Sequence, residues 1–153
     1  MVVIAIITVL ATFIIPNVGT GRARAQQAKC LNNVRTLLTA AIVDSTDNQG
    51  SFVNFPSTLS SLFDGRNLDP STADCPAGSS VATVTYDASD NATLADGEYS
   101  LVVGMTSTVP GTNPLVYDTA DNHGGYNVGY VGGYVKFSTS APTPSGGTTV
   151  VTS

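Results

Sequence analysis

Charge is scarce in this 153-residue chain and is missing from its start. Only 11% of the residues are charged, against about a quarter in an average soluble protein, and no acidic side chain precedes Asp44. The chain has two cysteines, one histidine and no tryptophan. Glycine, serine, threonine and asparagine fill the space instead, which is typical of exported surface proteins rather than of cytosolic enzymes.

The few charges are unevenly placed. Residues 1–43 carry four basic side chains and a net charge of +4, whereas residues 44–153 carry all eleven acids and a net charge of −9. With a pI near 4.4, the body is not expected to bind nucleic acid through its phosphates. The basic cluster could contact lipid phosphates or the acidic body of a neighbouring copy.

The first fifteen residues, MVVIAIITVLATFII, contain no charged side chain. As a helix this run rises about 22 Å, which is less than the roughly 30 Å of a bilayer core. It is therefore a truncated membrane anchor, an export signal or a helix that is buried among copies of itself. A secretory signal cleaved at Ala23-Arg24-Ala25 is one reading.

A second helical segment is predicted over residues 22–44, after an interruption by Pro16, Gly19 and Gly21 where we expect the helix to kink or melt. Its apolar face has helical spacing, with Cys30 at the edge of that face and Asn33 among the residues lying elsewhere. The members of the face are Leu31, Val34, Leu38, Ala41 and Ile42.

Beyond residue 80 the apolar pattern changes to a period of two. Strands are predicted at 81–87, 98–104, 114–118, 126–131 and 133–138, the last two joined by a hairpin turn at Gly132-Gly133. One short helix is expected from Thr58 to Phe63, and the Ser/Thr/Pro/Gly-rich tail 138–153 is expected to be loosely ordered. The predicted fold class is α+β, a long N-terminal helix packed on a small antiparallel sheet.

The two cysteines, Cys30 and Cys75, permit one intramolecular disulfide if the chain is exported. Metal binding is the weaker interpretation, because there is no CxxC motif and His123 is the only histidine. We therefore predict no metal site and no cofactor, with calcium at Asp118, Asp121 and Asn122 as a minor alternative.

No catalytic site is predicted. A Ser100–His123–Asp118 triad can be written on paper, but the nucleophile elbow G-x-S-x-G is absent. Exposed modification sites are a separate possibility: Asn91-Ala92-Thr93 fits the N-glycosylation pattern, and Ser140 and Thr143 are candidates for O-linked sugar.

The N-terminal run MVVIAIITVLATFIIPN resembles the first helix of type IV pilins and type II secretion pseudopilins. One branch, the pilin-like proteins with an H-x9-DG motif found in planctomycetes and their relatives, is similar over residues 1 to about 137. Its members often read ARxxxCxxN, DNxGxFP, a CP dipeptide and HGGGxNVLFADGHVKF, against ARAQQAKCLNN, DNQGSFVNFP, Cys75-Pro76 and HGGYNVGYVGGYVKF here. The matching motif residues of the last block are His123, Gly124, Gly125, Gly132 and Gly133.

Two departures accompany this resemblance. Eight residues rather than nine separate His123 from Gly132, and Gly132 replaces the expected Asp. Such pilins also carry a glutamate near the mature N-terminus that is important for assembly, and here the first acid is Asp44. We expect Met1 to lie about half a dozen residues inside the mature protein, whose apolar run would then reach about twenty residues.

The resemblance implies a pilin-like fold with an apolar anchor and polymerisation helix at 1–21, a globular domain at 22–137 containing helix 22–44 and sheet 81–138, and a tail at 138–153. It implies a non-enzymatic subunit that is anchored in the inner membrane, meets the assembly machinery there and then polymerises with its own copies into a surface filament. The alternatives are a secretion pseudopilin and a monomeric secreted binding domain. The expected polymerisation interface comprises Val2, Val3, Ile6, Ile7, Leu10, Phe13 and Ile14.

Overall fold

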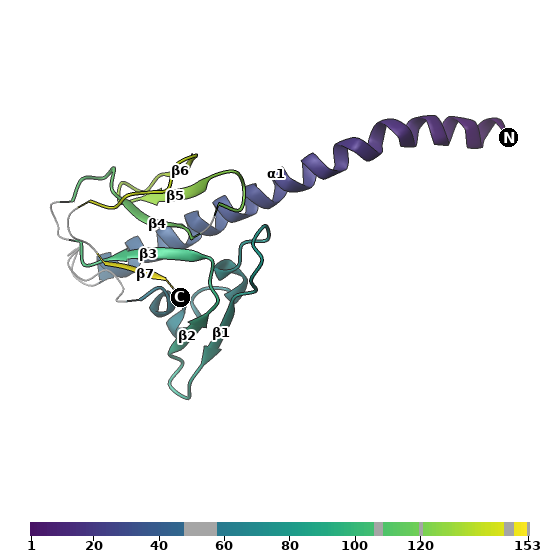
Figure 1. Cartoon of the computed structure of the whole chain (residues 1–153). Helices are drawn as coiled ribbons and strands as arrows, with labels where there is room; N and C mark the ends of the chain where they lie inside the picture. Colours follow the sequence, from purple (N-terminus) through teal and green to yellow (C-terminus); the bar gives the residue numbers. More distant parts are fainter. Residues whose placement is uncertain (48–57, 106–108, 120, 146–148, 153) are drawn as a thin grey trace.

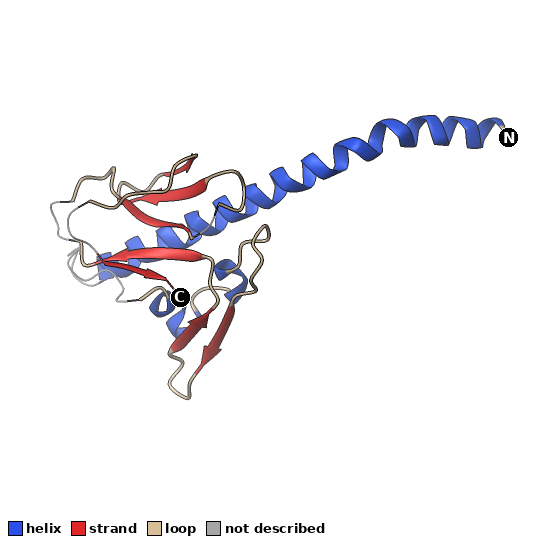
Figure 2. Ribbon diagram, viewed as in Figure 1, coloured by secondary structure: helices blue, strands red, loops and turns tan. Residues whose placement is uncertain are grey.

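One long helix and a five-stranded antiparallel sheet dominate the computed structural model (Figures 1 and 2). The structure describes residues 1–47, 58–105, 109–119, 121–145 and 149–152, and only the backbone of residues 13–18, 47, 66 and 149–152. Helix α1 spans Val2–Asp47. Figure 1 shows its C-terminal part lying along the sheet and its N-terminal part projecting away from the body.

The projecting part of α1, residues 1–25, is called the arm below. Its described side chains are exposed apart from Ala11, which is half-buried. The helix continues through Pro16, Gly19 and Gly21, so the expected melting there is wrong. Proline removes one backbone hydrogen bond, and the helical turns on either side hold the geometry while the axis curves gently (Figure 1). Within the described residues no helix combines the length and apolar character that crossing a bilayer requires.

The second half of α1 packs on the sheet through the predicted apolar face. Val34, Leu38 and Ala41 are buried, while Leu31 and Ile42 are half-buried. The buried face also includes Cys30, Leu37 and Asn33, so the expectation that Asn33 lies off this face is wrong. The α+β class is confirmed.

The main sheet has the strand order β6-β5-β4-β3-β7, and all of its neighbours are antiparallel. Helix α1 contacts the β4, β5 and β6 strands. The strands are β3 (Tyr99–Val103), β4 (Pro114–Asp118), β5 (Tyr126–Tyr130), β6 (Val135–Ser138) and β7 (Thr149–Thr152). A second sheet pairs β1 (Thr83–Tyr86) with β2 (Ala92–Ala95).

The five predicted strands are thus present, but the expectation of a single sheet over residues 81–138 is wrong, because β1 pairs with β2 in a sheet of its own. Other differences lie between and after the predicted strands. Strand β2 was not expected, because ATLA is short and contains two alanines. Strand β7 places an edge strand in the tail that was expected to be loosely ordered. The short helix at 58–63 is found as a 3-10 element, η2 (Ser60–Arg66), and a second one, η3 (Pro70–Ala73), was missed.

The predicted β5–β6 hairpin is confirmed with a slightly longer turn. The Tyr130 N–H donates to the Tyr134 carbonyl at 2.9 Å, and the Gly133 N–H donates to the Tyr130 carbonyl at 2.8 Å. Gly133 has φ +81°, a left-handed conformation that glycine adopts without steric cost. Three residues therefore form the turn, and the bulge type of hairpin explains the position of Gly133.

Close approach of α1 to the sheet depends on Gly129 in β5. A Cβ atom at this position would lie 3.3 Å from Val34 Cγ1 and 3.3 Å from Leu38 Cδ2. Contacts of that length are tighter than ordinary van der Waals packing, so a side chain at residue 129 would require Val34 and Leu38 to shift.

We expect Gly129→Ala to lower the free energy of unfolding by about 1–3 kcal/mol, the usual cost of overpacking a core. Gly21→Ala is the matched control, because a Cβ there would meet nothing within 4 Å. Urea denaturation followed by circular dichroism measures both. Equal stability of the Gly129→Ala variant and its parent would contradict the close helix–sheet contact.

Candidate functional site

A short segment, Asp74–Pro76, lies along the middle of α1 and is called the strap below. Asn33 Nδ2 donates to the Asp74 carbonyl at 2.8 Å, and Gln26 Nε2 donates to the Pro76 carbonyl at 2.7 Å. Between them, Cys30 forms a disulfide with Cys75. Residues 26, 30 and 33 are spaced four and three apart and so lie on one helix face.

The residues that precede the strap lead into it with an extended backbone. Asp69 caps η3 by accepting from the Ser71 N–H at 2.8 Å, and Pro70 begins the helical turn. The side-chain and backbone hydrogen bonds that Asp69 accepts from Ser71 lower the pKa of Asp69. The chain leaves η3 in a β conformation at Asp74, and the strap then ends in a turn where the Gly78 N–H donates to the Cys75 carbonyl at 2.8 Å.

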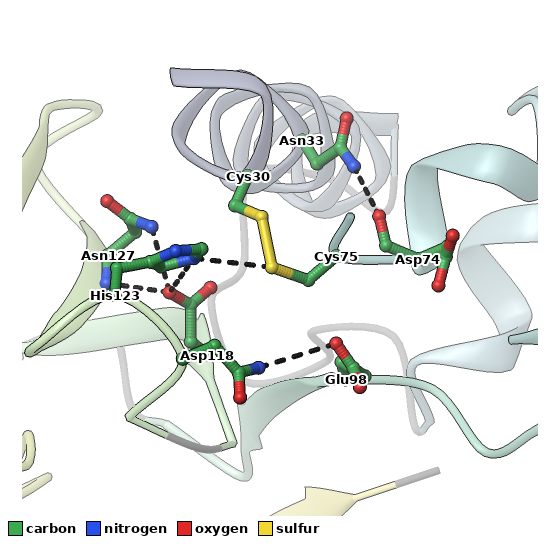
Figure 3. A network of polar contacts seen from close by, with 9 residues as sticks. Cys30, Asn33, Asp74, Cys75, Glu98, Asp118, His123 and Asn127 are labelled. Atoms are coloured by element: carbon green, nitrogen blue, oxygen red, sulfur yellow. Dashed lines mark hydrogen bonds and ion pairs between the residues drawn. A yellow bond between two sulfur atoms is a disulfide. The ribbon is translucent and has the colours of Figure 1, made fainter. Parts of the chain in front are cut away.

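The predicted disulfide between Cys30 and Cys75 is confirmed. The two Cα atoms are 5.2 Å apart, an ordinary separation for a disulfide, and both cysteines are fully buried. The only histidine of the chain lies beside it: His123 Nε2 is 3.3 Å from Cys75 Sγ (Figure 3). His123 comes from the connection between β4 and β5, so three distant segments meet here.

The same nitrogen of His123 also lies near Asp118, at the end of β4. His123 Nε2 lies 3.9 Å from Asp118 Oδ2, and the two side chains are 3% and 1% exposed. Asp118 Oδ2 accepts from both the Asn127 N–H (2.9 Å) and Asn127 Nδ2 (2.8 Å), whereas Asp118 Oδ1 has no hydrogen-bond partner. Burial raises the pKa of Asp118 to about 6, and burial lowers the pKa of His123.

A second buried carboxylate, that of Glu98, ties the strap region to the start of β3. Its Oε1 accepts from the Ser80 N–H at 3.1 Å, and its Oε2 accepts from Asn122 Nδ2 at 3.4 Å. The carboxylate lies against Gly78, where any Cβ atom would collide with it. Figure 3 shows Glu98 below the disulfide, in the same layer of polar side chains.

The structure does not assemble the Ser100–His123–Asp118 triad. Asp118 pairs with Tyr99 across β3 and β4, whereas Ser100 pairs with Tyr117. Because successive strand residues point to opposite faces, the Ser100 side chain lies on the face of the sheet away from Asp118. Among the described residues, the buried Asp118–His123 pair therefore lacks the serine that the triad needs.

The three calcium candidates have different surroundings. Asp118 is buried against Asn127, Asn122 donates to Glu98, and Asp121 is exposed. Calcium binding there stays a prediction. Among the described residues, one group of histidine, cysteine and acidic side chains has metal-ligand proximity, and it consists of Cys30, Cys75 and His123, whose ligand atoms all lie within 4.8 Å of one another.

The other predicted site residues lie away from this cluster. In the expected polymerisation interface the side chains of Val2, Val3, Ile6, Ile7 and Leu10 are exposed by 54–74%, and those of Phe13 and Ile14 lie outside the described part. The glycosylation candidates Asn91, Ser140 and Thr143 are exposed. Asn91 also donates through Nδ2 to Asp87 Oδ2 at 2.9 Å, a hydrogen bond that lowers the pKa of Asp87.

The glycines of the HGG sequence and of the β5–β6 turn adopt backbone conformations or make close contacts that other residues would not fit. Gly124 has φ +74° directly after His123, and a Cβ on Gly125 would collide with the Phe137 ring and the Ser138 carbonyl. Gly132 and Gly133 form the β5–β6 turn. The first two glycines therefore shape the loop that brings His123 to the disulfide.

A groove of about 660 Å³ lies between α1 and η2, remote from the disulfide. One wall comes from residues 35–44 of the helix and the other from residues 61–68, and the lining mixes apolar, hydroxyl and charged groups. This mixture offers no cluster of catalytic or metal-ligating side chains.

Sequence reasoning missed Gln26, Asn33, Glu98 and Asn127. A signal existed for Asn33, which lies three residues after Cys30 and next to Val34 on the buried helix face. No local signal marks Glu98 or Asn127, because their partners are more than eight residues away in the chain.

Comparisons with known proteins leave the family open. A scan against protein-family models finds no matching model, and neither the curated proteins nor the solved structures yield a match.

We expect the double variant Cys30→Ala/Cys75→Ala to lose about 4 kcal/mol of unfolding free energy, because the disulfide closes a loop between residues 45 apart. Gln26→Ala is the control: it removes one strap hydrogen bond but keeps the disulfide, and should cost about 1 kcal/mol. Urea denaturation measures both losses. A double variant that is as stable as its parent would contradict the stabilising role of the disulfide.

Asp118→Asn tests the buried carboxylate in the disulfide-bonded chain. The folded state raises the pKa of Asp118 to about 6, above the roughly 3.9 of an unfolded chain, so folding favours the protonated form. Stability from this group is present below about pH 4 and is lost as the pH rises through 6.

The neutral amide introduced by Asp118→Asn does not ionise, so the variant does not lose this stability as the pH rises. At pH 7 we therefore expect the variant to be more stable than its parent by up to about 3 kcal/mol, and we expect the difference to shrink towards pH 4. Asp121→Asn, at an exposed position, is the control. Thermal unfolding across pH 4–8 measures both variants, and a difference that is constant with pH would contradict the raised pKa.

Proposed function

We propose that this protein is a structural subunit of a type IV pilus-like filament and polymerises with its own copies through the arm. The observation that carries the proposal is the exposure of the arm: Met1, Val2, Val3 and Ile4 are each more than 60% exposed on a helix that has no charged residue before Arg22. A helix that is apolar on all sides is normally buried in an apolar environment. A contiguous exposed apolar surface marks an interaction site.

The polar groups within the arm suit burial among helices. Thr8 Oγ1 donates to the Ile4 carbonyl (3.1 Å) and the Ala5 carbonyl (2.9 Å), and Thr12 Oγ1 donates to the Thr8 carbonyl at 2.9 Å. Their hydroxyls are thus satisfied inside the helix and need no water. Small hydroxyl residues four apart also let neighbouring helices approach closely.

The charges also suit repeated contacts between copies. Arg22 and Arg24 are exposed where the arm meets the body, whereas exposed acids such as Asp87, Asp96 and Asp121 belong to the body. Opposite charges on the base of the arm and on the body favour a staggered arrangement in which the base of one arm lies near the body of the next copy. The resemblance of the first seventeen residues to pilin helices supports the same arrangement.

The energy available is large compared with the cost of association. Burying on the order of 1,000 Å² of apolar surface on the arm, at about 25 cal/mol/Å², contributes on the order of 25 kcal/mol before entropic costs. Before assembly the arm would need another apolar environment. Inner-membrane lipid and the assembly machinery are the partners that the pilin resemblance implies, and a surface filament is the product.

A secreted domain released after Ala25 is the second candidate. The observation in its favour is that the contacts of the strap with α1 involve Gln26, Cys30 and Asn33, so cleavage after Ala25 would leave the strap intact. A pseudopilin of a secretion system would use the same arm in a shorter polymer. The mature N-terminus separates the secreted domain from both assemblies, and filament length separates the two assemblies.

We expect Ile6→Asp and Leu10→Asp each to abolish filaments, because each variant places an unpaired carboxylate in an apolar bundle. A penalty of about 4 kcal/mol per subunit raises the concentration needed for assembly roughly a thousandfold. Negative-stain microscopy and the yield of material sheared from cells measure the effect.

Val81→Asp is the matched control, because Val81 is an apolar residue of the body that is 76% exposed. It should leave the yield unchanged. Filaments that persist in both arm variants would overturn assembly through the arm. Material that begins at Gln26 and contains no filaments would favour the secreted domain.

A further inference from the structure

The two cysteines and the single histidine of this chain lie close together in the fold. The chain has only two cysteines and one histidine, and the ligand atoms of all three lie within 4.8 Å of one another. They come from α1, from the strap and from the β4–β5 connection; the cysteines are 45 positions apart in the sequence, and Cys75 and His123 are 48 positions apart. Burial of a disulfide does not by itself require a histidine next to it.

The interaction of His123 with the disulfide is a weak one. A cysteine sulfur is a poor hydrogen-bond acceptor, yet His123 Nε2 lies 3.3 Å from Cys75 Sγ with its side chain almost fully buried. The same nitrogen is 3.9 Å from Asp118 Oδ2, and Asp118 Oδ1 has no partner. The His123 imidazole nitrogen therefore lies near both the buried disulfide and a buried carboxylate.

We propose that the reduced form of this chain binds a zinc-class divalent cation through Cys30 Sγ, Cys75 Sγ and His123 Nε2, with a carboxylate oxygen of Asp118 in the fourth position. Two sulfurs, one nitrogen and one oxygen form a tetrahedral ligand set that suits zinc. Ligand atoms in such a site are about 3.3–3.8 Å apart, given bond lengths of about 2.0–2.3 Å. The distances around His123 Nε2 already fall near this range.

The metal-bound and disulfide-bonded forms exclude each other. The newly synthesised chain carries two thiols, and binding of M²⁺ releases the two thiol protons and forms two metal–thiolate bonds. Oxidation of the site by a protein or small-molecule disulfide removes two electrons from the two thiolates, forms the Cys30–Cys75 bond and frees the metal ion. The oxidant is reduced to two thiolates, which take up two protons from solvent to become thiols. The metal would thus hold the strap against α1 until the disulfide replaces it.

The Asn127 side chain has the position of a supporting residue. It donates to Asp118 Oδ2 through Nδ2, and the Asn127 backbone N–H donates to the same oxygen, which fixes the carboxylate while leaving Oδ1 available. Groups that orient metal ligands in this way contribute about 10–100-fold to metal affinity.

The test uses the full chain in detergent, reduced by a water-soluble phosphine without oxygen and freed of the reagent in metal-free buffer. The phosphine and one water become phosphine oxide, and the disulfide becomes two thiols. Cobalt(II) is the spectroscopic probe and zinc(II) the competitor. We expect one cobalt ion per reduced chain, the absorption of a tetrahedral thiolate site, displacement by zinc, and no cobalt absorption in the disulfide-bonded chain.

Three variants separate this site from thiols acting alone. His123→Gln keeps both cysteines and should weaken cobalt binding at least about 100-fold, more than the loss of a supporting residue. Asp118→Asn should weaken it and shift the absorption bands. Asp121→Asn, at an exposed position of the same loop, should bind like the parent.

Circular dichroism of each reduced chain, with and without zinc, covers the case in which reduction unfolds the protein. The parent should then regain its folded spectrum with one equivalent of zinc, and His123→Gln should not. Cobalt binding that is unaffected by His123→Gln, a stoichiometry other than one, or no binding to the reduced parent would each overturn the proposal.

Discussion

The packing of helix α1 from Gln26 to Ser45 against the body is the interaction on which the rest of the structure depends. Gly129 lets β5 approach Val34 and Leu38, and the strap fastens the N-terminal part of the same buried face through one disulfide and two hydrogen bonds. These contacts end at Gln26. About 37 Å of the same helix, at 1.5 Å per residue, therefore projects from the body with its apolar side chains exposed.

Much of this architecture follows from patterns that are local in the sequence. The period-two runs give five strands, the helical spacing of Val34, Leu38 and Ala41 gives the buried face, and an even cysteine count gives the disulfide. Other features depend on tertiary context. The helix passes Pro16 because long helical segments flank it, and Asn33 is buried because the strap supplies a carbonyl that no local pattern reveals.

The candidate site likewise combines residues that the sequence pattern could identify with others whose positions depend on the fold. His123 could be singled out by its rarity and by the HGG motif, and Asp118 by its place five residues earlier. The cysteines could not be placed beside His123, because Cys30 and Cys75 reach it only through the fold. Burial then gives these groups properties unlike those of exposed ones, including the raised pKa of Asp118. The cluster holds the strap, β4 and α1 together, and so fixes the body from which the arm projects. The proposed assembly and the proposed metal binding would thus use separate parts of one helix.

The most direct test of assembly through the arm is peptide-resolved hydrogen–deuterium exchange on the assembled material, which needs no substitution. If copies pack through the arm, the backbone amides of residues 2–25 will be protected to a degree comparable with those of the buried segment 30–41, because both lie in closed interfaces. If instead the arm exchanges within the first time point while segment 30–41 stays protected, it is open to water in the assembly, and the account is contradicted.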